Sequence, residues 1–152
     1  MKKIVLTGGG TAGHVSPNLT LVPHLKKHFD EIYYIGSNGI EKELVKKAGI
    51  PFYEIPSTKL RRKLTLKNLA IPFTLISAIN KAKILLKNLK PDIIFSKGGY
   101  VSLPVVIAGN ALKIPVVSHE SDITAGLANK IASKYCVKTL TAFPQTEKEF
   151  KN

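Results

Sequence analysis

Residues 3–17 read Lys-Ile-Val-Leu-Thr-Gly-Gly-Gly-Thr-Ala-Gly-His-Val-Ser-Pro, a short apolar run that leads directly into a glycine-rich loop. The apolar run predicts a strand at Lys3–Thr7, and the glycines allow a tight turn into a following helix. A strand, a glycine turn and a helix form the first unit of many α/β proteins. The stretch therefore predicts an α/β fold that is built on a parallel sheet.

The same alternation continues along the chain. Further strands are predicted at 31–35, 52–55, 92–96, 115–118 and 137–141, and helices at 17–28, 40–48, 66–89, 103–112 and 126–135. Pro17 suits the first position of its helix, whereas Pro23 and Pro72 should kink or restart theirs. Strand and helix alternating six times predict a Rossmann-like sheet with helices on both faces, followed only by a polar tail at 145–152.

Composition limits the class of protein. With 152 residues the chain fits one domain, residues 1–152, and its 23 Lys and Arg against 10 Asp and Glu give a net charge of +13. One cysteine excludes a disulfide framework and favours a reducing, intracellular setting. The apolar runs are too short for a signal peptide or a membrane span. The charge predicts an anionic partner: nucleic acid, a phosphorylated molecule or an acidic membrane.

The basic charge is concentrated between Glu54 and Asp92, where no acidic residue occurs. Basic residues beside aliphatic ones favour an anionic lipid surface, whereas single-stranded RNA would require aromatic residues for stacking. We therefore predict no nucleic-acid partner and a membrane patch of Arg61, Arg62, Lys63, Lys67, Leu69, Ile71, Phe73 and Ile76. The open alternative is an ordinary helix with one core face and one solvated lysine-rich face.

Three unusual loops follow predicted strands, at 8–14, 97–102 and 119–122. In an open parallel sheet such loops meet at the carboxyl ends of the strands, where ligands bind. Glycines in the first two loops let backbone N–H groups approach an anion, so a diphosphate is the expected ligand. The alternative is a pair of tight turns that bind nothing.

His14 closes the first glycine loop, close to the predicted start of a helix. A helix dipole favours the neutral imidazole there, and a neutral imidazole can accept a proton from a hydroxyl group at physiological pH. We therefore interpret His14 as a candidate general base rather than as a residue that only caps a turn. His119 and Glu120 lack a third ligand at metal-binding spacing, so no metal is predicted.

Gly8, Gly10 and Gly13 also spell the G-x-G-x-x-G pattern of dinucleotide-binding oxidoreductases. That function requires an acidic residue at the end of the second strand to hold a ribose hydroxyl. Residues 35–37 read Ile-Gly-Ser, and Glu41 falls inside the next predicted helix. The pattern is incomplete, and an NAD-type oxidoreductase remains only an alternative.

Three quoted stretches together resemble one family. Thr-Gly-Gly-Gly-Thr-Ala-Gly-His-Val-Ser-Pro at 7–17, Gly-Gly-Tyr-Val-Ser-Leu-Pro at 98–104 and His-Glu-Ser-Asp-Ile-Thr-Ala-Gly-Leu-Ala-Asn-Lys at 119–130 are similar to the N-terminal half of the MurG family. The resemblance implies one half of a two-domain GT-B glycosyltransferase. It also implies inverting transfer of N-acetylglucosamine (GlcNAc) from UDP-GlcNAc to the 4-hydroxyl of N-acetylmuramic acid in lipid I, which forms lipid II for peptidoglycan.

The resemblance also implies roles for the loop residues. His14 would be the catalytic base. The donor would lie against Thr11, Ala12, Gly13 and Asp122. The acceptor would lie against Gly10, Gly98, Gly99, Tyr100, Glu120 and Asn129. No cofactor is implied, and the family works as a peripheral protein at the cytoplasmic face of the plasma membrane.

This sequence departs from the family at two site positions, with Ala12 where the family commonly has glycine and Asp122 where it often has asparagine. A methyl group at position 12 is tolerable unless the backbone needs a positive φ. The chain also stops about where the family crosses to its C-terminal, UDP-GlcNAc-binding domain. We therefore expect it to be catalytically incomplete alone. A non-catalytic, membrane-docking subunit of a split UDP-GlcNAc transferase is the further alternative.

Overall fold

The computed structural model describes residues 1–57 and 71–150. These residues form one six-stranded parallel sheet in the order β3-β2-β1-β4-β5-β6. The strands are β1 (Lys3–Thr7), β2 (Glu31–Gly36), β3 (Phe52–Glu54), β4 (Ile93–Ser96), β5 (Val116–Glu120) and β6 (Lys138–Thr141). The predicted parallel sheet is confirmed, and each predicted strand is correct to within one or two residues at its ends.

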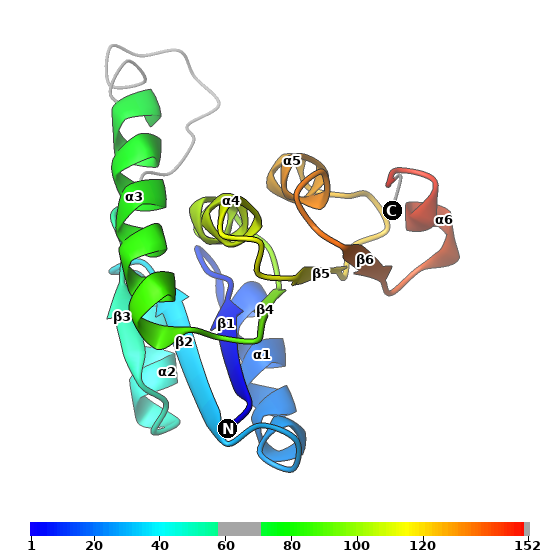
Figure 1. Cartoon of the computed structure of the whole chain (residues 1–152). Helices are drawn as coiled ribbons and strands as arrows, with labels where there is room; N and C mark the ends of the chain where they lie inside the picture. The colour runs from blue at the N-terminus through cyan, green and yellow to red at the C-terminus, as the bar shows by residue number, and fades with distance from the viewer. Residues whose placement is uncertain (58–70, 151–152) are drawn as a thin grey trace.

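Six helices connect or follow the strands in this part of the chain (Figure 1). They are α1 (Ala12–Leu25), α2 (Ile40–Lys47), α3 (Ile71–Leu89), α4 (Leu103–Ala111), α5 (Leu127–Ser133) and α6 (Pro144–Glu147). The described part of α3 begins at Ile71, so the predicted start at residue 66 lies outside the described residues.

The prediction for α1 is wrong at its start. The helix begins at Ala12 and runs through both Pro17 and Pro23, so neither proline starts it or restarts it. Proline removes one N–H donor from a helix. For Pro17 the carbonyl left without that donor is the one of Gly13, which is an exposed residue. The helix can therefore begin directly at the glycine loop.

The prediction that only a polar tail follows the last strand is also wrong, because α6 forms at Pro144–Glu147. Thr146 is fully buried, and its hydroxyl contacts the carbonyl oxygens of Asp122 and Ile123 at 3.0 and 2.7 Å. These contacts attach α6 to the loop after β5. A single threonine anchor of this kind leaves no periodic pattern in the sequence.

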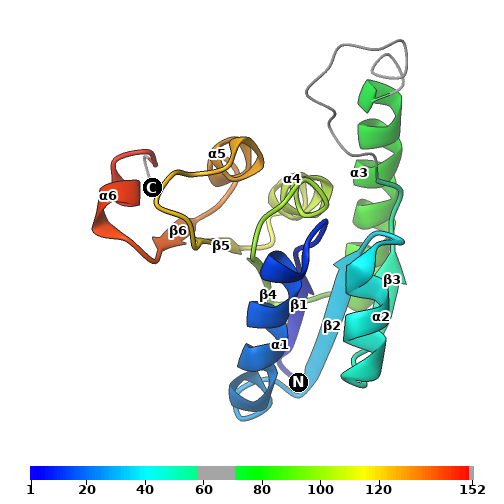
Figure 2. The same cartoon turned by 180° about the vertical axis from the view of Figure 1, so that it is seen from behind.

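Helices cover both faces of the sheet, as predicted (Figures 1 and 2). Alternate residues of a strand point to opposite faces. Leu6 therefore joins a core with Val15 of α1 and Val45 of α2, while Val5 joins a second core that includes α3, α4 and α5. Burying one such aliphatic side chain contributes about 1.5–3 kcal/mol, so the two cores fix the helices on the sheet.

The strand register brings three loops to one edge of the sheet. Thr7 at the end of β1 lies beside Ser96 at the end of β4, and Ser96 lies beside Ser118 of β5. The loops after these strands therefore start side by side. No helix among the described residues is long and apolar enough to cross a membrane.

Candidate functional site

The first two glycine loops pack directly on each other. The Gly9 N–H donates a hydrogen bond to the Gly98 carbonyl oxygen at 3.4 Å. Gly99 has a φ of +83°, and a Cβ atom there would lie 2.3 Å from the Gly9 carbonyl oxygen. A Cβ atom on Gly10 would lie 2.5 Å from the Tyr100 ring. The absence of side chains therefore lets the loops interlock and brings Gly10 against Tyr100.

A buried carboxylate closes the inner side of the first loop. Glu41 of α2 is fully buried, and its carboxylate accepts hydrogen bonds from the N–H groups of Gly10 at 3.3 Å and Ser37 at 3.0 Å. Gly10 is the middle glycine of the dinucleotide pattern, so this N–H is not available to the pyrophosphate of a dinucleotide. The NAD-type alternative is not favoured. The sequence signal for Glu41 is its place in the first turn of a helix, shortly after Gly36 and Gly39.

His14 is held between the two glycine loops. It lies in the first turn of α1 and is half-buried, with its Nδ1 3.2 Å from the Lys97 carbonyl oxygen. A carbonyl oxygen can only accept a hydrogen bond, so Nδ1 carries the proton and Nε2 of the neutral ring keeps its lone pair. A Cβ atom on Gly99 would lie 3.1 Å from the ring. The arrangement gives a fixed imidazole that can act as a base through Nε2.

Lys97 connects all three loops, a role that sequence reasoning missed. Its N–H donates to the Thr7 carbonyl oxygen at 2.9 Å, its own carbonyl oxygen holds His14, and its ammonium donates to the Ser121 hydroxyl. The residue is only 4% exposed. Burial lowers the pKa of the ammonium, and the nearby carboxylates of Glu120 and Asp122 oppose that shift. The only sequence signal for this role of Lys97 is its place after a buried strand and directly before two glycines.

The loop after β5 is organised by Glu120. Its buried carboxylate accepts hydrogen bonds from the Asp122 N–H at 3.0 Å, the Gly126 N–H at 3.1 Å and the Asn129 side-chain amide at 2.7 Å. Burial opposes ionisation of Glu120, but these hydrogen bonds outweigh it and hold the pKa of the carboxyl below its usual range. Glu120 therefore sets the shape of this loop.

Asn129 joins the loop after β5 to the second glycine loop. A Cβ atom on Gly98 would lie 2.2 Å from the Asn129 side-chain oxygen, so glycine is required for this approach. That buried oxygen has no hydrogen-bond partner among the described residues. The structure thus brings Gly98, Glu120 and Asn129 together. Asp122 is exposed at the outer side of the same loop.

Thr11, Ala12 and Gly13 form the exposed entrance to α1. Thr11 is the N-cap residue in an extended conformation, and its side chain makes no capping bond to the described chain. Ala12 is helical and does not adopt a positive φ, so its methyl group costs no backbone strain. The three residues lie beside His14, at the same edge as the second loop.

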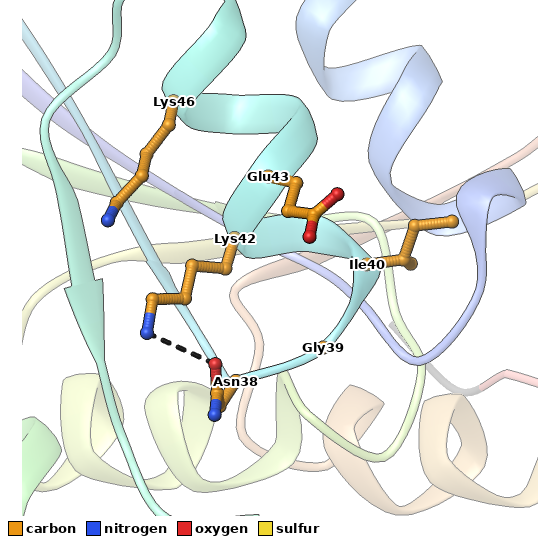
Figure 3. A pocket seen from close by; sticks show the side chains of 6 residues that line it. All are labelled: Asn38, Gly39, Ile40, Lys42, Glu43 and Lys46. Atoms are coloured by element: carbon orange, nitrogen blue, oxygen red, sulfur yellow. Dashed lines mark hydrogen bonds between the residues drawn. The ribbon is translucent and has the colours of Figure 1, made fainter.

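Two hollows lie near this edge. A groove of about 710 Å³ runs between α1 and the neighbouring strands, and the side chains of Lys97 and His119 line it beside apolar residues. Burial and the charge of Lys97 lower the pKa of His119, while Glu120 opposes the shift. A second pocket lies at the start of α2, where Lys42 donates to Asn38 at 3.1 Å (Figure 3). It contains none of the predicted site residues.

The predicted membrane patch is described only in part. Arg61, Arg62, Lys63, Lys67 and Leu69 lie outside the described residues, and so does the side chain of Ile71. Phe73 and Ile76 lie on α3 with 75% and 57% of their surface exposed. On the same helix Lys81 and Lys87 are exposed and Lys83 is half-buried. The two described side chains of the predicted patch are therefore exposed and apolar, and exposed lysines follow them on the same helix.

Comparison with known proteins gives a consistent result. Residues 4–141 match the model of the glycosyltransferase family 28 N-terminal domain. The chain is 56% identical over 152 residues to the UDP-N-acetylglucosamine--N-acetylmuramyl-(pentapeptide) pyrophosphoryl-undecaprenol N-acetylglucosamine transferase of Clostridium botulinum strain Langeland, with 99% of this chain and 43% of the relative covered. A relative of the same name from Lachnospira eligens is 58% identical over 149 residues, with 97% and 42% covered. The chain thus spans less than half the length of these relatives.

Solved structures agree with this comparison. MurG of Acinetobacter baumannii superposes with a TM-score of 0.81 at 31% identity, over 96% of this chain and 42% of that one. The UDP-GlcNAc 2-epimerase of Methanocaldococcus jannaschii superposes with a TM-score of 0.69 at 15% identity, over 98% and 41%, and shares the fold.

Proposed function

The chain belongs to the glycosyltransferase family 28 N-terminal domain family, and from this premise we propose that it supplies the acceptor-binding half of a GlcNAc transferase. The donor is UDP-GlcNAc and the acceptor is lipid I, the undecaprenyl-diphosphate that carries N-acetylmuramyl-pentapeptide. The relatives' names support both substrates. The product, lipid II, is the precursor for peptidoglycan, which cell shape and division require.

The observation that carries the proposal is the fixed imidazole of His14. Its Nδ1 is held by the Lys97 carbonyl oxygen, which leaves Nε2 to accept a proton. As the acceptor 4-hydroxyl oxygen bonds to the anomeric carbon of GlcNAc, its proton passes to Nε2. The bond between that carbon and the UDP oxygen breaks, and UDP leaves with both electrons. Attack on the face opposite to UDP inverts the configuration, and general-base catalysis contributes about 10²–10⁴-fold to such a step.

The remaining loop residues divide between the two substrates. The acceptor diphosphate lies against Gly98, Gly99 and Tyr100, close to Gly10. The donor lies against Thr11, Ala12 and Gly13, with Asp122 at the outer side of the cleft. Glu120 shapes the loop, and Asn129, whose side-chain amide donates to Glu120, lies against Gly98 beside the acceptor.

The basic, apolar surface of α3 supports peripheral attachment to an anionic membrane at its cytoplasmic face. Phe73 and Ile76 are exposed where a lipid-linked acceptor needs a protein close to the bilayer. The +13 charge of the chain favours the same surface. The alternative of a non-catalytic docking subunit is not favoured, because the relatives are single chains of more than twice this length that are named as transferases.

The decisive experiment compares this chain alone with the same chain joined to the C-terminal half of the Clostridium botulinum relative. UDP-GlcNAc is titrated into each protein, and transfer to a lipid I analogue is then measured. We expect weak or no donor binding by the chain alone, and both binding and transfer by the joined protein. A joined protein that binds UDP-GlcNAc but leaves the lipid I analogue unmodified would contradict the proposal.

A further inference from the structure

Glu41 is a fully buried carboxylate that the reaction above does not use. It takes part in none of the ion pairs formed by the described residues. Its charge is instead balanced by hydrogen-bond donors, which are the Gly10 N–H, the Ser37 N–H and the Ser37 hydroxyl. Burying a charge without hydrogen-bond partners destabilises a fold. The three donors must therefore stay in place around the Glu41 carboxylate.

Three glycines leave room for this carboxylate. A Cβ atom on Gly9 would lie 2.6 Å from the carboxyl carbon of Glu41, and one on Gly39 would lie 2.7 Å from a carboxylate oxygen. A Cβ atom on Gly36 would lie 2.9 Å from Cγ of Glu41. These glycines come from the first loop, the end of β2 and the N-cap of α2. The three glycines therefore form a cavity that the Glu41 side chain fills.

The neighbouring Glu43 shows that position on the helix does not explain this burial. Glu41 and Glu43 both lie in the first turn of α2, where the helix dipole favours a negative charge. Glu43 is exposed and lines the outer pocket at the start of α2 (Figure 3). Only Glu41 turns inward to the glycine loop.

We propose that Glu41 is a positioning residue whose carboxylate takes, from inside the fold, the place of an anion on the first glycine loop. It holds Gly10, and through the next residues the start of α1 and His14, in position before any ligand binds. Its negative charge also repels a second anion on this side. This inference rests on the proposed function, and it confines the acceptor diphosphate to the outer side of the first loop, against the second loop.

The first test is chemical rescue of Glu41→Ala in this chain, with Glu43→Ala as the matched control. Loss of the buried acceptor should lower the melting temperature by roughly 5 °C or more, whereas the control should change little. Formate, a free carboxylate that fits the vacated space, should restore at least half of that loss, and chloride at equal ionic strength should not. Equal effects of formate and chloride, or equal melting temperatures for both variants, would overturn the proposal.

The second test needs no variant. Inorganic pyrophosphate is titrated into the ¹⁵N-labelled wild-type chain, and the amide signals of Gly10, Gly99 and Tyr100 are followed. We expect the Gly99 and Tyr100 signals to shift clearly and the Gly10 signal to shift much less, because the Gly10 N–H already donates to Glu41. A shift of Gly10 as large as theirs would overturn the inner-anion assignment. If no amide shifts, the diphosphate site of the proposed function fails, whereas formate rescue still decides the role of Glu41.

Discussion

The Nδ1 atom of His14 lies 3.2 Å from the carbonyl oxygen of Lys97, so the loop after β4 holds an imidazole in the first turn of α1. The two residues are 83 positions apart in the sequence. Because a carbonyl oxygen fixes the proton on Nδ1, the contact determines that Nε2 is the ring nitrogen that keeps its lone pair. The chemistry of the site therefore depends on the packing of the two glycine loops.

Because the site depends on this packing of the loops, a side chain at Gly99 should lower the stability of the fold substantially. In Gly99→Ala the new methyl group would meet the Gly9 carbonyl oxygen, and the residue would be strained at its φ of +83°. We expect the free energy of unfolding to fall by about 2 kcal/mol or more, measured by urea denaturation. Gly126→Ala is the control, since φ there is −65° and its Cβ atom meets no described atom within 4 Å. Equal stability of the two variants would disprove the interlocked loops.

A second prediction concerns the pH dependence of stability. The pKa of Glu120 is held below its ordinary value of 4.5, because hydrogen bonds outweigh the effect of burial. A carboxyl whose pKa is lower in the folded state stabilises the fold above its unfolded pKa, and this contribution is lost as the pH falls through the folded pKa. The stability difference between wild type and Glu120→Gln should therefore be constant above about pH 6 and shrink below about pH 4.5.

Urea denaturation at several pH values measures that difference directly. Glu43→Gln serves as the control, because Glu43 is exposed on the outer side of α2. A gap between wild type and Glu120→Gln that grows as the solution is acidified would contradict the predicted sign.

A third prediction concerns the surface of α3. We expect the chain to bind anionic vesicles and to release them as salt is added, since each basic residue near the surface contributes about 1 kcal/mol that salt screens. Replacing Phe73 and Ile76 together by serine should weaken binding in vesicle sedimentation. Val137 is another exposed apolar residue, and it lies outside α3. The Val137→Ser variant should therefore bind the vesicles as the wild type does. Binding that is independent of salt, or unchanged by the double replacement, would show that this surface of α3 is not the membrane-binding patch.

Local sequence patterns were sufficient to predict most of the fold. The apolar runs and the glycine turns identify the strands, because their period and their boundaries are local properties. The start of α1 was missed because Pro17 resembles a first helical residue, whereas the helix already begins at Ala12. No local pattern shows that the helix tolerates a proline in its second turn, where the carbonyl that loses its donor belongs to the exposed residue Gly13.

The site was predictable where it consists of loops and unpredictable where it consists of contacts between them. Gly98, Gly99 and His14 stand out as loop residues, and the strand order brings them together. Glu41 belongs to a helix, and only its three-dimensional contacts show that it supports the first loop. Lys97 follows a strand, and only its contact with His14 shows that it holds the imidazole. Partners separated by tens of residues leave no sequence spacing to detect.

The most direct test of the account is the rate of transfer by His14→Ala in the chain joined to the C-terminal half of a relative. With UDP-GlcNAc and a lipid I analogue both saturating, loss of the base should lower kcat by about 10²–10⁴-fold. His28→Ala, an exposed histidine near the other end of α1, should retain the wild-type rate. If His14→Ala keeps kcat within a factor of about two of wild type, His14 is not the base and the account of this site is wrong.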